Sequence, residues 1–199
     1  MVASDLTPQM LAVARGLARE RNIVNMSFAD VRAEALPFAD GIFDLVTCRI
    51  APHHFDDVRK FVIESARVLR SGGLFGLVEN VSPDPSMMAG EPAALAGAAD
   101  EYNAFEKHRD PSHVRCLTLG EWRSLVADAG LVERHVELLD KPMVLGPWAD
   151  QQNVGDAVKA DLKSMLLDGS PAFRAFVRPQ ENKGDIDFIL TEAVIIAAK

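Results

Sequence analysis

The hydrophobic and polar positions of the chain follow two repeats in turn. Short, mostly apolar runs, which are typical of buried strands, occupy residues 2–5, 23–29, 43–48 and 74–79. After residue 7, and again from residue 56 to residue 70, apolar residues recur every three or four positions, which predicts amphipathic helices. Strands that alternate with helices predict an α/β fold with a mostly parallel sheet and helices on both faces.

One long segment interrupts this alternation. Residues 83–114 carry many alanines and no strand signal, which predicts a helical insertion above the sheet. Beyond it, the pattern predicts helices and strands in alternation, at residues 119–129, 132–139, 150–167 and 186–198. No repeat or low-complexity linker divides the chain, so we expect a single domain over residues 1–199, with 83–114 as a lid that is more mobile than the sheet.

Composition narrows the classes of protein to which the chain can belong. Of 199 residues, 48% are hydrophobic and 25% charged, which suits a globular core and excludes a disordered or collagen-like chain. The net charge of −8 has the wrong sign for a nucleic-acid partner. Cys48 and Cys116 are too few for a disulfide framework. Without a signal sequence or an apolar run of about 18 residues, we expect a cytoplasmic protein with no membrane partner.

Ligands of open parallel sheets bind where the strands end, so we considered the residues that follow each predicted strand. The first strand ends in Asp5, with Leu6 after it, and Thr7-Pro8 then begins a helix. This segment resembles the second-strand motif of the class I S-adenosylmethionine-dependent methyltransferases. The resemblance implies that Asp5 accepts hydrogen bonds from the ribose hydroxyls of the cofactor.

Three further segments carry the same resemblance in the same order. Asp30 and Val31, followed by Leu36-Pro37-Phe38, resemble the family's next signature, which implies that Asp30 binds the adenine amino group and the Val31 amide an adenine nitrogen. Residues 40–55 are similar to the family's fourth strand and its loop, and residues 66–73 to the junction that follows. The resemblance covers residues 1–80 most closely and is strongest to the small-molecule enzymes near the ubiquinone and menaquinone methyltransferases.

The resemblance also implies a fold, a cofactor and a partner. We expect a Rossmann-like, mostly parallel sheet with an antiparallel C-terminal strand, S-adenosyl-L-methionine as cofactor and a small-molecule acceptor, without a metal. The chain departs from the family in having no Gly-x-Gly, the loop that lets backbone amides approach the cofactor. The first β-α unit is therefore expected to be missing, either by truncation or because another segment or subunit replaces it.

That departure has a structural consequence. In the family the first strand lies between the strands that correspond to residues 2–5 and 43–48, so each of these is left with an unpaired edge. We expect a homo-oligomer in which a second copy covers the edges, or a collapse that joins the two strands, and weak cofactor binding in either case.

Further candidate residues lie after the later strands. His53 and His54 are candidates for a general base or for orienting the acceptor, and Arg49 for the cofactor carboxylate. Glu79 and Asn80 are candidates for acceptor contacts. From the insertion, Tyr102, Arg109 and His113 are expected to line the acceptor pocket.

Two alternative functions remain open at this point. The half-sheet could serve as a non-catalytic binding or assembly module, because a missing glycine loop weakens cofactor affinity. A nicotinamide oxidoreductase also places an acid after its second strand, but the Leu-Pro-Phe loop and the lack of a glycine-rich phosphate loop argue against it.

Overall fold

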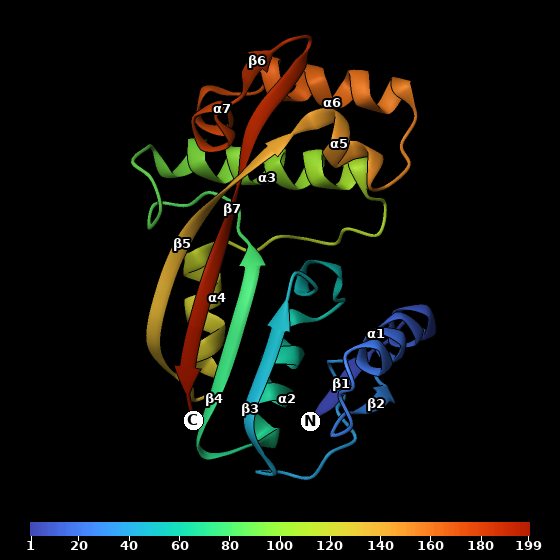
Figure 1. Ribbon diagram of the computed structural model, residues 1–199. Helices are drawn as coiled ribbons and strands as arrows, with labels where there is room; N and C mark the ends of the chain where they lie inside the picture. The colour runs from blue at the N-terminus through green and yellow to red at the C-terminus, as the bar shows by residue number, and fades with distance from the viewer.

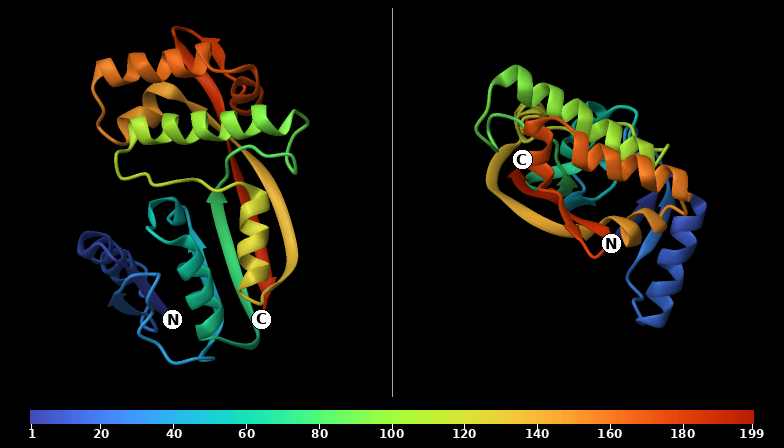
Figure 2. Two further views of the ribbon diagram at one scale, coloured as in Figure 1. Left: turned by 180° about the vertical axis from the view of Figure 1, so that it is seen from behind. Right: turned by 90° about the horizontal axis from the view of Figure 1, so that it is seen from above.

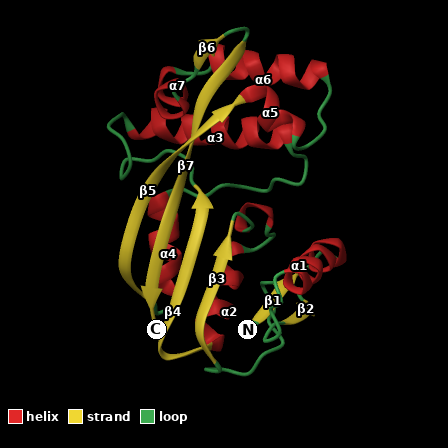
Figure 3. Cartoon of the chain, in the orientation of Figure 1, coloured by secondary structure: helices red, strands yellow, loops and turns green.

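The computed structural model describes residues 1–199 and contains two separate sheets (Figures 1 and 3). The smaller sheet pairs two short strands in parallel, β1 (Val2–Asp5) and β2 (Ser27–Asp30), which α1 (Pro8–Glu20) connects. The strands of the larger sheet are β3 (Phe43–Arg49), β4 (Leu69–Asn80), β5 (Val132–Val144), β6 (Gln180–Asn182) and β7 (Asp185–Ala198).

The larger sheet has the mixed direction that the sequence predicts. Its order is β3-β4-β7-β5, with β6 paired to β7. β3 and β4 are parallel, whereas β7 runs antiparallel to both of its long neighbours, β4 and β5. The expected antiparallel C-terminal strand is thereby confirmed, and it lies in the middle of the sheet rather than at an edge.

Helices cover one face of this sheet, which corrects the expectation that both faces are covered. Both α2 (Val58–Val68) and α4 (Leu119–Asp128) pack on the same face, as the view from behind shows (Figure 2). Their apolar side chains form one core with Phe75, Leu77 and Ile195 of the strands. On the opposite face Leu45 and Leu74 are 56% and 41% exposed.

A second core lies above the strand ends (Figure 1). Four helices build this cap, namely α3 (Pro92–Arg109), α5 (Leu145–Asp150), α6 (Asp156–Asp168) and α7 (Pro171–Val177). The insertion is helical as expected, but α3 is central to the cap core: Tyr102 and Phe105 are fully buried, packed with residues of the other cap helices. The expectation of a loose lid therefore does not suit this packing.

Some element boundaries differ from the expected ones. The helix expected to stop at Ser71–Gly73 ends at Val68, because the backbone from Leu69 onward already pairs with β3. Gly72, with φ of +74°, takes the turn conformation within this extended segment. The helix expected over 150–167 begins later, at Asp156, as α6, and β2 begins at Ser27 rather than at residue 23.

The collapse of the first strand onto the third is not observed. β1 forms a ladder only with β2, and β3 only with β4, so each keeps one unpaired edge.

No helix of the structure is both long enough and apolar enough to cross a membrane.

Candidate functional site

The parallel strands β3 and β4 end at the same edge of the sheet, directly below the cap (Figure 1). β3 continues through Ile50 into a short 3-10 turn, Pro52–His54. Ile50 has φ of +48°, a left-handed conformation that β-branched residues rarely adopt, and its N–H donates to the Val78 carbonyl at 2.9 Å. Such strain, about 1–3 kcal/mol, often marks functional loops.

This strained turn brings His53 onto the carboxylate at the end of β4. His53 Nδ1 lies 2.8 Å from Glu79 Oε1, and the His53 backbone N–H donates to Glu79 Oε2 at 3.3 Å. The two side chains are only 11% and 1% exposed. The His53 carbonyl also accepts hydrogen bonds from the backbone N–H groups of Val114 and Arg115. The backbone of His53 is therefore fixed on both sides and its imidazole is held through Nδ1, which leaves Nε2 as the remaining ring nitrogen.

The charge of Glu79 controls the protonation of His53. Burial by itself would lower the pKa of His53, but the hydrogen bond and charge of Glu79, supported by Glu106 and Asp110, raise this pKa above its ordinary value. An imidazole with a pKa near neutrality can accept a proton in one step and lose it in the next. The pair has the chemistry of a general base with an orienting carboxylate.

A cavity of about 200 Å³ adjoins this pair. It lies between the sheet end and the cap. Eleven residues from both parts line it: Ile50, His53, Asn80, Glu106, Arg109, Cys116, Lys141, Met143, Trp148, Gln151 and Leu190. The lining combines apolar side chains with several polar and charged groups, and small-molecule sites use such polar groups to orient a ligand.

Two polar atoms of the cavity lining have no hydrogen-bond partner in the protein. They are Asn80 Oδ1 and Arg109 Nε, and both are buried. The Arg109 guanidinium lies 4.0 Å from the Trp148 ring centre, and its remaining contacts are long, 3.4 Å to the Trp148 carbonyl and 3.5 Å to Glu106. Unpaired buried polar groups cost about 1–3 kcal/mol each, so they indicate positions where a ligand completes the hydrogen bonds.

The predicted cofactor residues lie at the end of the smaller sheet. Asp5 and Asp30 are register partners at the carboxyl ends of β1 and β2. The Asp5 carboxylate accepts a hydrogen bond from the Thr7 N–H at 2.7 Å. The Val31 N–H lies 3.3 Å from the Asp5 carbonyl and donates to it, so it is not free for the expected adenine contact. Leu6 is 55% exposed.

Cys48 lies between the two groups of candidates. Burial, with smaller contributions from the charges of Glu79 and Asp5, raises the pKa of the Cys48 thiol to about 12. Both carboxylates are therefore near this thiol, Glu79 from the cavity and Asp5 from the smaller sheet. Arg49, the next residue, is exposed at the end of β3 and forms no ion pair.

Besides Glu79, which contacts His53 instead, three residues predicted to reach the acceptor do not line the cavity. His54 is exposed, and its Nδ1 lies 3.1 Å from the Ser112 carbonyl. Tyr102 is fully buried in the cap, where its hydroxyl donates to Glu106 at 3.3 Å. His113 pairs with Asn103, and burial together with His53 and His54 lowers its pKa to about 4.

The structure adds residues that the sequence did not single out as site candidates. Glu106 lines the cavity from the same face of α3 as the predicted Arg109, one turn before it, and burial raises the pKa of Glu106. Cys116 places its thiol within 4.8 Å of ligand atoms of His53 and Glu79. Burial and nearby carboxylates raise the pKa of this thiol well above its ordinary value, which keeps it protonated near neutral pH.

No local signal could have found Lys141 or Trp148, because both come from the distant strand β5 and helix α5. Cys116 was foreseen only as a small buried residue, which it is.

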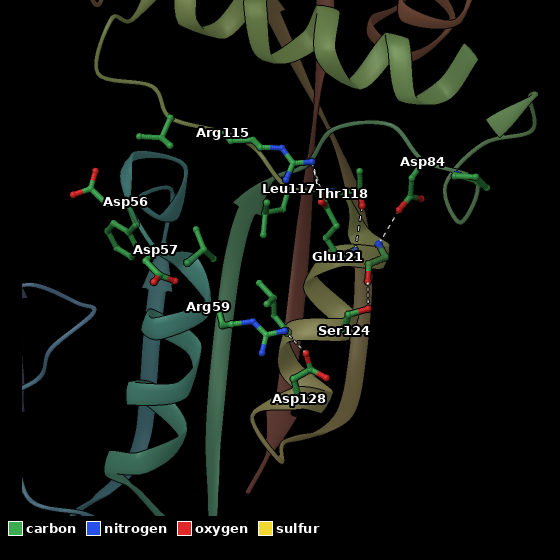
Figure 4. A pocket seen from close by; sticks show the side chains of 16 residues that line it. Asp56, Asp57, Arg59, Asp84, Arg115, Leu117, Thr118, Glu121, Ser124 and Asp128 are labelled. Carbon is green, nitrogen blue, oxygen red and sulfur yellow. Dashed lines mark hydrogen bonds and ion pairs between the residues drawn. The ribbon is translucent and has the colours of Figure 1, made fainter. Parts of the chain in front are cut away.

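A larger hollow of about 690 Å³ lies between α2 and α4 (Figure 4). Its charged groups are already paired with one another or with neighbours. Arg59 binds Asp128 at 2.6 Å, Arg115 binds Glu121 at 2.8 Å, and Asp84 accepts the Gly120 N–H at 2.8 Å. With its polar groups satisfied, this groove is a weaker candidate for chemistry than the smaller cavity, despite its size.

Comparisons with known proteins agree with this arrangement. A family model described as a methyltransferase domain matches residues 1–77. The methyltransferase YcgJ of Bacillus subtilis is 37% identical over 148 residues, 74% of this chain and 54% of that protein. The crystal structure of the YcgJ protein superposes with a TM-score of 0.88 at 32% identity, covering all of this chain and 81% of that one.

A third match is shorter. The demethylmenaquinone methyltransferase of Thermus thermophilus is 40% identical over 83 residues, 42% of this chain and 37% of that protein. In sequence, this chain thus spans about half or less of the length of these two curated relatives.

Proposed function

Because the chain belongs to the class I S-adenosylmethionine-dependent methyltransferases, we propose that it transfers a methyl group from S-adenosylmethionine to a small molecule in the cavity beside His53. One observation carries the proposal. The hydrogen-bonded pair of His53 and Glu79, with its raised histidine pKa, borders a cavity that has unpaired polar atoms. A base, its orienting carboxylate and a place for the acceptor are thus assembled at one point.

The residues of the smaller sheet fit the cofactor. Asp5 and Asp30 stand side by side at the strand ends, and neither carboxylate forms an ion pair. Such carboxylates accept hydrogen bonds from a ribose diol and from an adenine amino group. Bound S-adenosylmethionine would supply an electrophilic methyl group on a positively charged sulfur, and the acidic groups Asp5 and Glu79 suit that charge.

The role of the protein is chiefly to hold the acceptor in line and to remove its proton. The acceptor atom forms its new bond to the methyl carbon as the carbon–sulfur bond breaks, and that electron pair stays on sulfur. The proton of the acceptor goes to His53 Nε2, while Glu79 keeps Nδ1–H oriented and stabilises the imidazolium that forms. The thioether product and the methylated acceptor then leave, and His53 releases its proton to solvent.

Cofactor binding tests this proposal directly. We expect Asp5→Asn to weaken S-adenosylhomocysteine binding by about 1–3 kcal/mol, roughly 5- to 150-fold, because the charge that receives the ribose hydroxyls is lost. Asparagine keeps an oxygen that can accept the Thr7 N–H, so the turn after β1 is retained. Isothermal titration calorimetry measures the change, with Asp100→Asn on the exposed side of α3 as the control. Unchanged affinity in Asp5→Asn would exclude this carboxylate as the ribose ligand.

We further propose that the chain assembles with copies of itself. The unpaired edges of β1 and β3 and the open apolar face around Leu45, Leu74 and Val132 support this. Light scattering is expected to give a mass at least twice that of the 21.7 kDa chain. Leu45→Lys, which places a charge on the β3 edge, should shift the protein toward monomer. A wild-type monomer at all concentrations would contradict the proposal.

A further inference from the structure

The unpaired polar atoms of the cavity limit the ligands that can bind there, because each atom requires a particular hydrogen-bonding partner. Asn80 Oδ1 can only accept a hydrogen bond, and Arg109 Nε can only donate one. A ligand that satisfies both must present a donor to Asn80 and an oxygen acceptor to Arg109. The two side chains come from the end of β4 and the end of α3, so they approach the cavity from the sheet and from the cap.

The part of the ligand that accepts a hydrogen bond from Arg109 should be anionic. Arg109 is stacked on Trp148, and both of its protein hydrogen bonds are at or beyond 3.4 Å, so its charge is only weakly neutralised. Its contacting carboxylate, Glu106, is also buried, and this burial raises the pKa of the Glu106 carboxyl group. Lys141 also lines the cavity, although it pairs with Glu192 at 2.7 Å. A carboxylate is the group that a buried, preoriented guanidinium binds best.

The part of the ligand that donates a hydrogen bond to Asn80 lies next to His53, the proposed base. Glu79 Oε1 accepts the Asn80 backbone N–H at 2.7 Å and lies 2.8 Å from His53 Nδ1. One carboxylate oxygen thus holds Asn80 and His53 beside each other. A hydroxyl group has one proton, which can go either to Asn80 Oδ1 or to His53 Nε2. An amino group has two, so it can donate to Asn80 and still give a proton to His53.

The size of the cavity limits the rest of the molecule. An apolar cavity of about 150 Å³ holds a benzene-sized ligand, so about 200 Å³ suits one ring with two small substituents. Trp148, Met143 and Leu190 give this space apolar walls.

Resting on the proposed function, we infer that the acceptor is a single-ring amine that also carries a carboxylate, with Asn80 and Arg109 as its specificity-determining residues. The amino nitrogen takes the methyl group with its lone pair, the carbon–sulfur bond breaks with its electrons left on sulfur, and one N–H proton passes to His53. The second N–H of the amine remains hydrogen-bonded to Asn80 Oδ1. The products are a secondary amine, a thioether and a protonated His53.

The experiment uses binding alone, so that it does not depend on turnover. The three aminobenzoate isomers, the matching hydroxybenzoates, benzoate and aniline are titrated into the wild-type chain at pH 7 without cofactor. At least one aminobenzoate should bind about 10-fold or more tightly than aniline, and about 2- to 10-fold more tightly than its hydroxy counterpart. Equal binding of aniline, or tighter binding of the hydroxybenzoates, would overturn the inference.

Variants assign each preference to its residue. Arg109→Met should abolish the preference for aminobenzoate over aniline, and Asn80→Leu should equalise the amino and hydroxy compounds. Arg115→Met, in an ion pair outside the cavity, is the matched control and should keep both preferences. If Arg109→Met fails to fold, Arg109→Lys takes its place. This variant retains the charge but lacks Nε, so it should lose part of the preference for aminobenzoate over aniline. Unchanged ratios in a folded Arg109 variant would contradict the assignment.

A separate titration with S-adenosylhomocysteine distinguishes the two proposals. If S-adenosylhomocysteine binds and no ring compound shows the carboxylate preference, the acceptor inference fails and the methyltransferase function stands. If aminobenzoate binds with the expected preferences and S-adenosylhomocysteine does not bind, the cavity is assigned correctly and the proposed reaction is wrong.

Discussion

His53→Gln is expected to lower kcat for methyl transfer by about 10²- to 10⁴-fold, the usual contribution of a positioned general base. Glutamine can keep a hydrogen bond to Glu79 but cannot take up a proton, so acceptor and cofactor should still bind while proton removal fails. The measurement is the steady-state rate of S-adenosylhomocysteine release with a responsive acceptor. S-adenosylhomocysteine affinity, measured by calorimetry, should be unchanged.

The control for this variant is His135→Gln, which changes a histidine on β5 that is half exposed and far along the sheet from the cavity. Its rate should equal that of the wild type. A His53→Gln enzyme with full kcat would show that the acceptor needs no base, and that His53 only shapes the cavity.

The pH profile separates a base from a structural histidine. Only the neutral imidazole can accept a proton, so activity should rise with pH through the pKa of His53, which Glu79 raises above its ordinary value. Glu79→Gln removes the hydrogen-bonding charge that causes this shift, and the burial that remains lowers the pKa. The acidic limb of the kcat/KM profile should therefore move to lower pH in Glu79→Gln. An unmoved limb would assign it to another group.

Phe105→Ala should destabilise the chain by about 3–5 kcal/mol, the range for removing a large buried aromatic side chain. Phe105 is fully buried at the centre of the cap, stacked on Trp148 with ring centres 5.0 Å apart and in edge contact with Phe173 and Phe188. Urea unfolding followed by circular dichroism measures the change, and Phe105→Leu, which leaves a smaller void, should lose less. A loss below about 1 kcal/mol would mean that the cap contributes little to stability.

The same variant tests whether α3 is a mobile lid. In the wild type, the buried face of α3 predicts that its amides exchange as slowly as those of β4 and β7, because opening the helix would expose the whole cap core. In Phe105→Ala these amides should exchange faster, with those of β4 less affected. Fast exchange of α3 in the wild type would restore the interpretation of residues 83–114 as a loose cover.

The sequence predicted well the strands and helices of the part of the molecule that contains the sheets, because their signals are local. The apolar runs at β1, β3 and β7 and the helical spacing in α2 and α4 depend on neighbouring residues, and the structure has these elements near the expected positions. The errors arise where distant pairing outweighs local preference. Glycines at residues 72 and 73 indicated a helix stop, yet the ladder with β3 draws the chain from Leu69 onward into β4.

Only the part of the candidate site that lies at the strand ends could be predicted from the sequence. His53, Glu79 and Asn80 follow strands whose common direction places them at one edge, so their proximity could be expected from topology. Arg109 was named for its place in the insertion, and it does line the cavity. Tyr102 was named for the same reason and instead faces the cap core, because helix orientation depends on packing that the local pattern of α3 does not reveal. His113, beyond the end of α3, pairs with Asn103 instead of lining the cavity.

By itself, then, the sequence determined the alternation of strands and helices, the acids that end β1 and β2, and the histidines that follow β3, since each depends on a few adjacent residues. Only the tertiary structure decided that Glu79 pairs with His53, that Arg109 and Trp148 close a cavity over them, and that the cap forms a core of its own. His53 and Glu79 are 26 positions apart in the chain, and Arg109 and Trp148 are 39 apart. Such pairings are selected by the free energy of burying the whole apolar surface at once, which no short window of sequence contains.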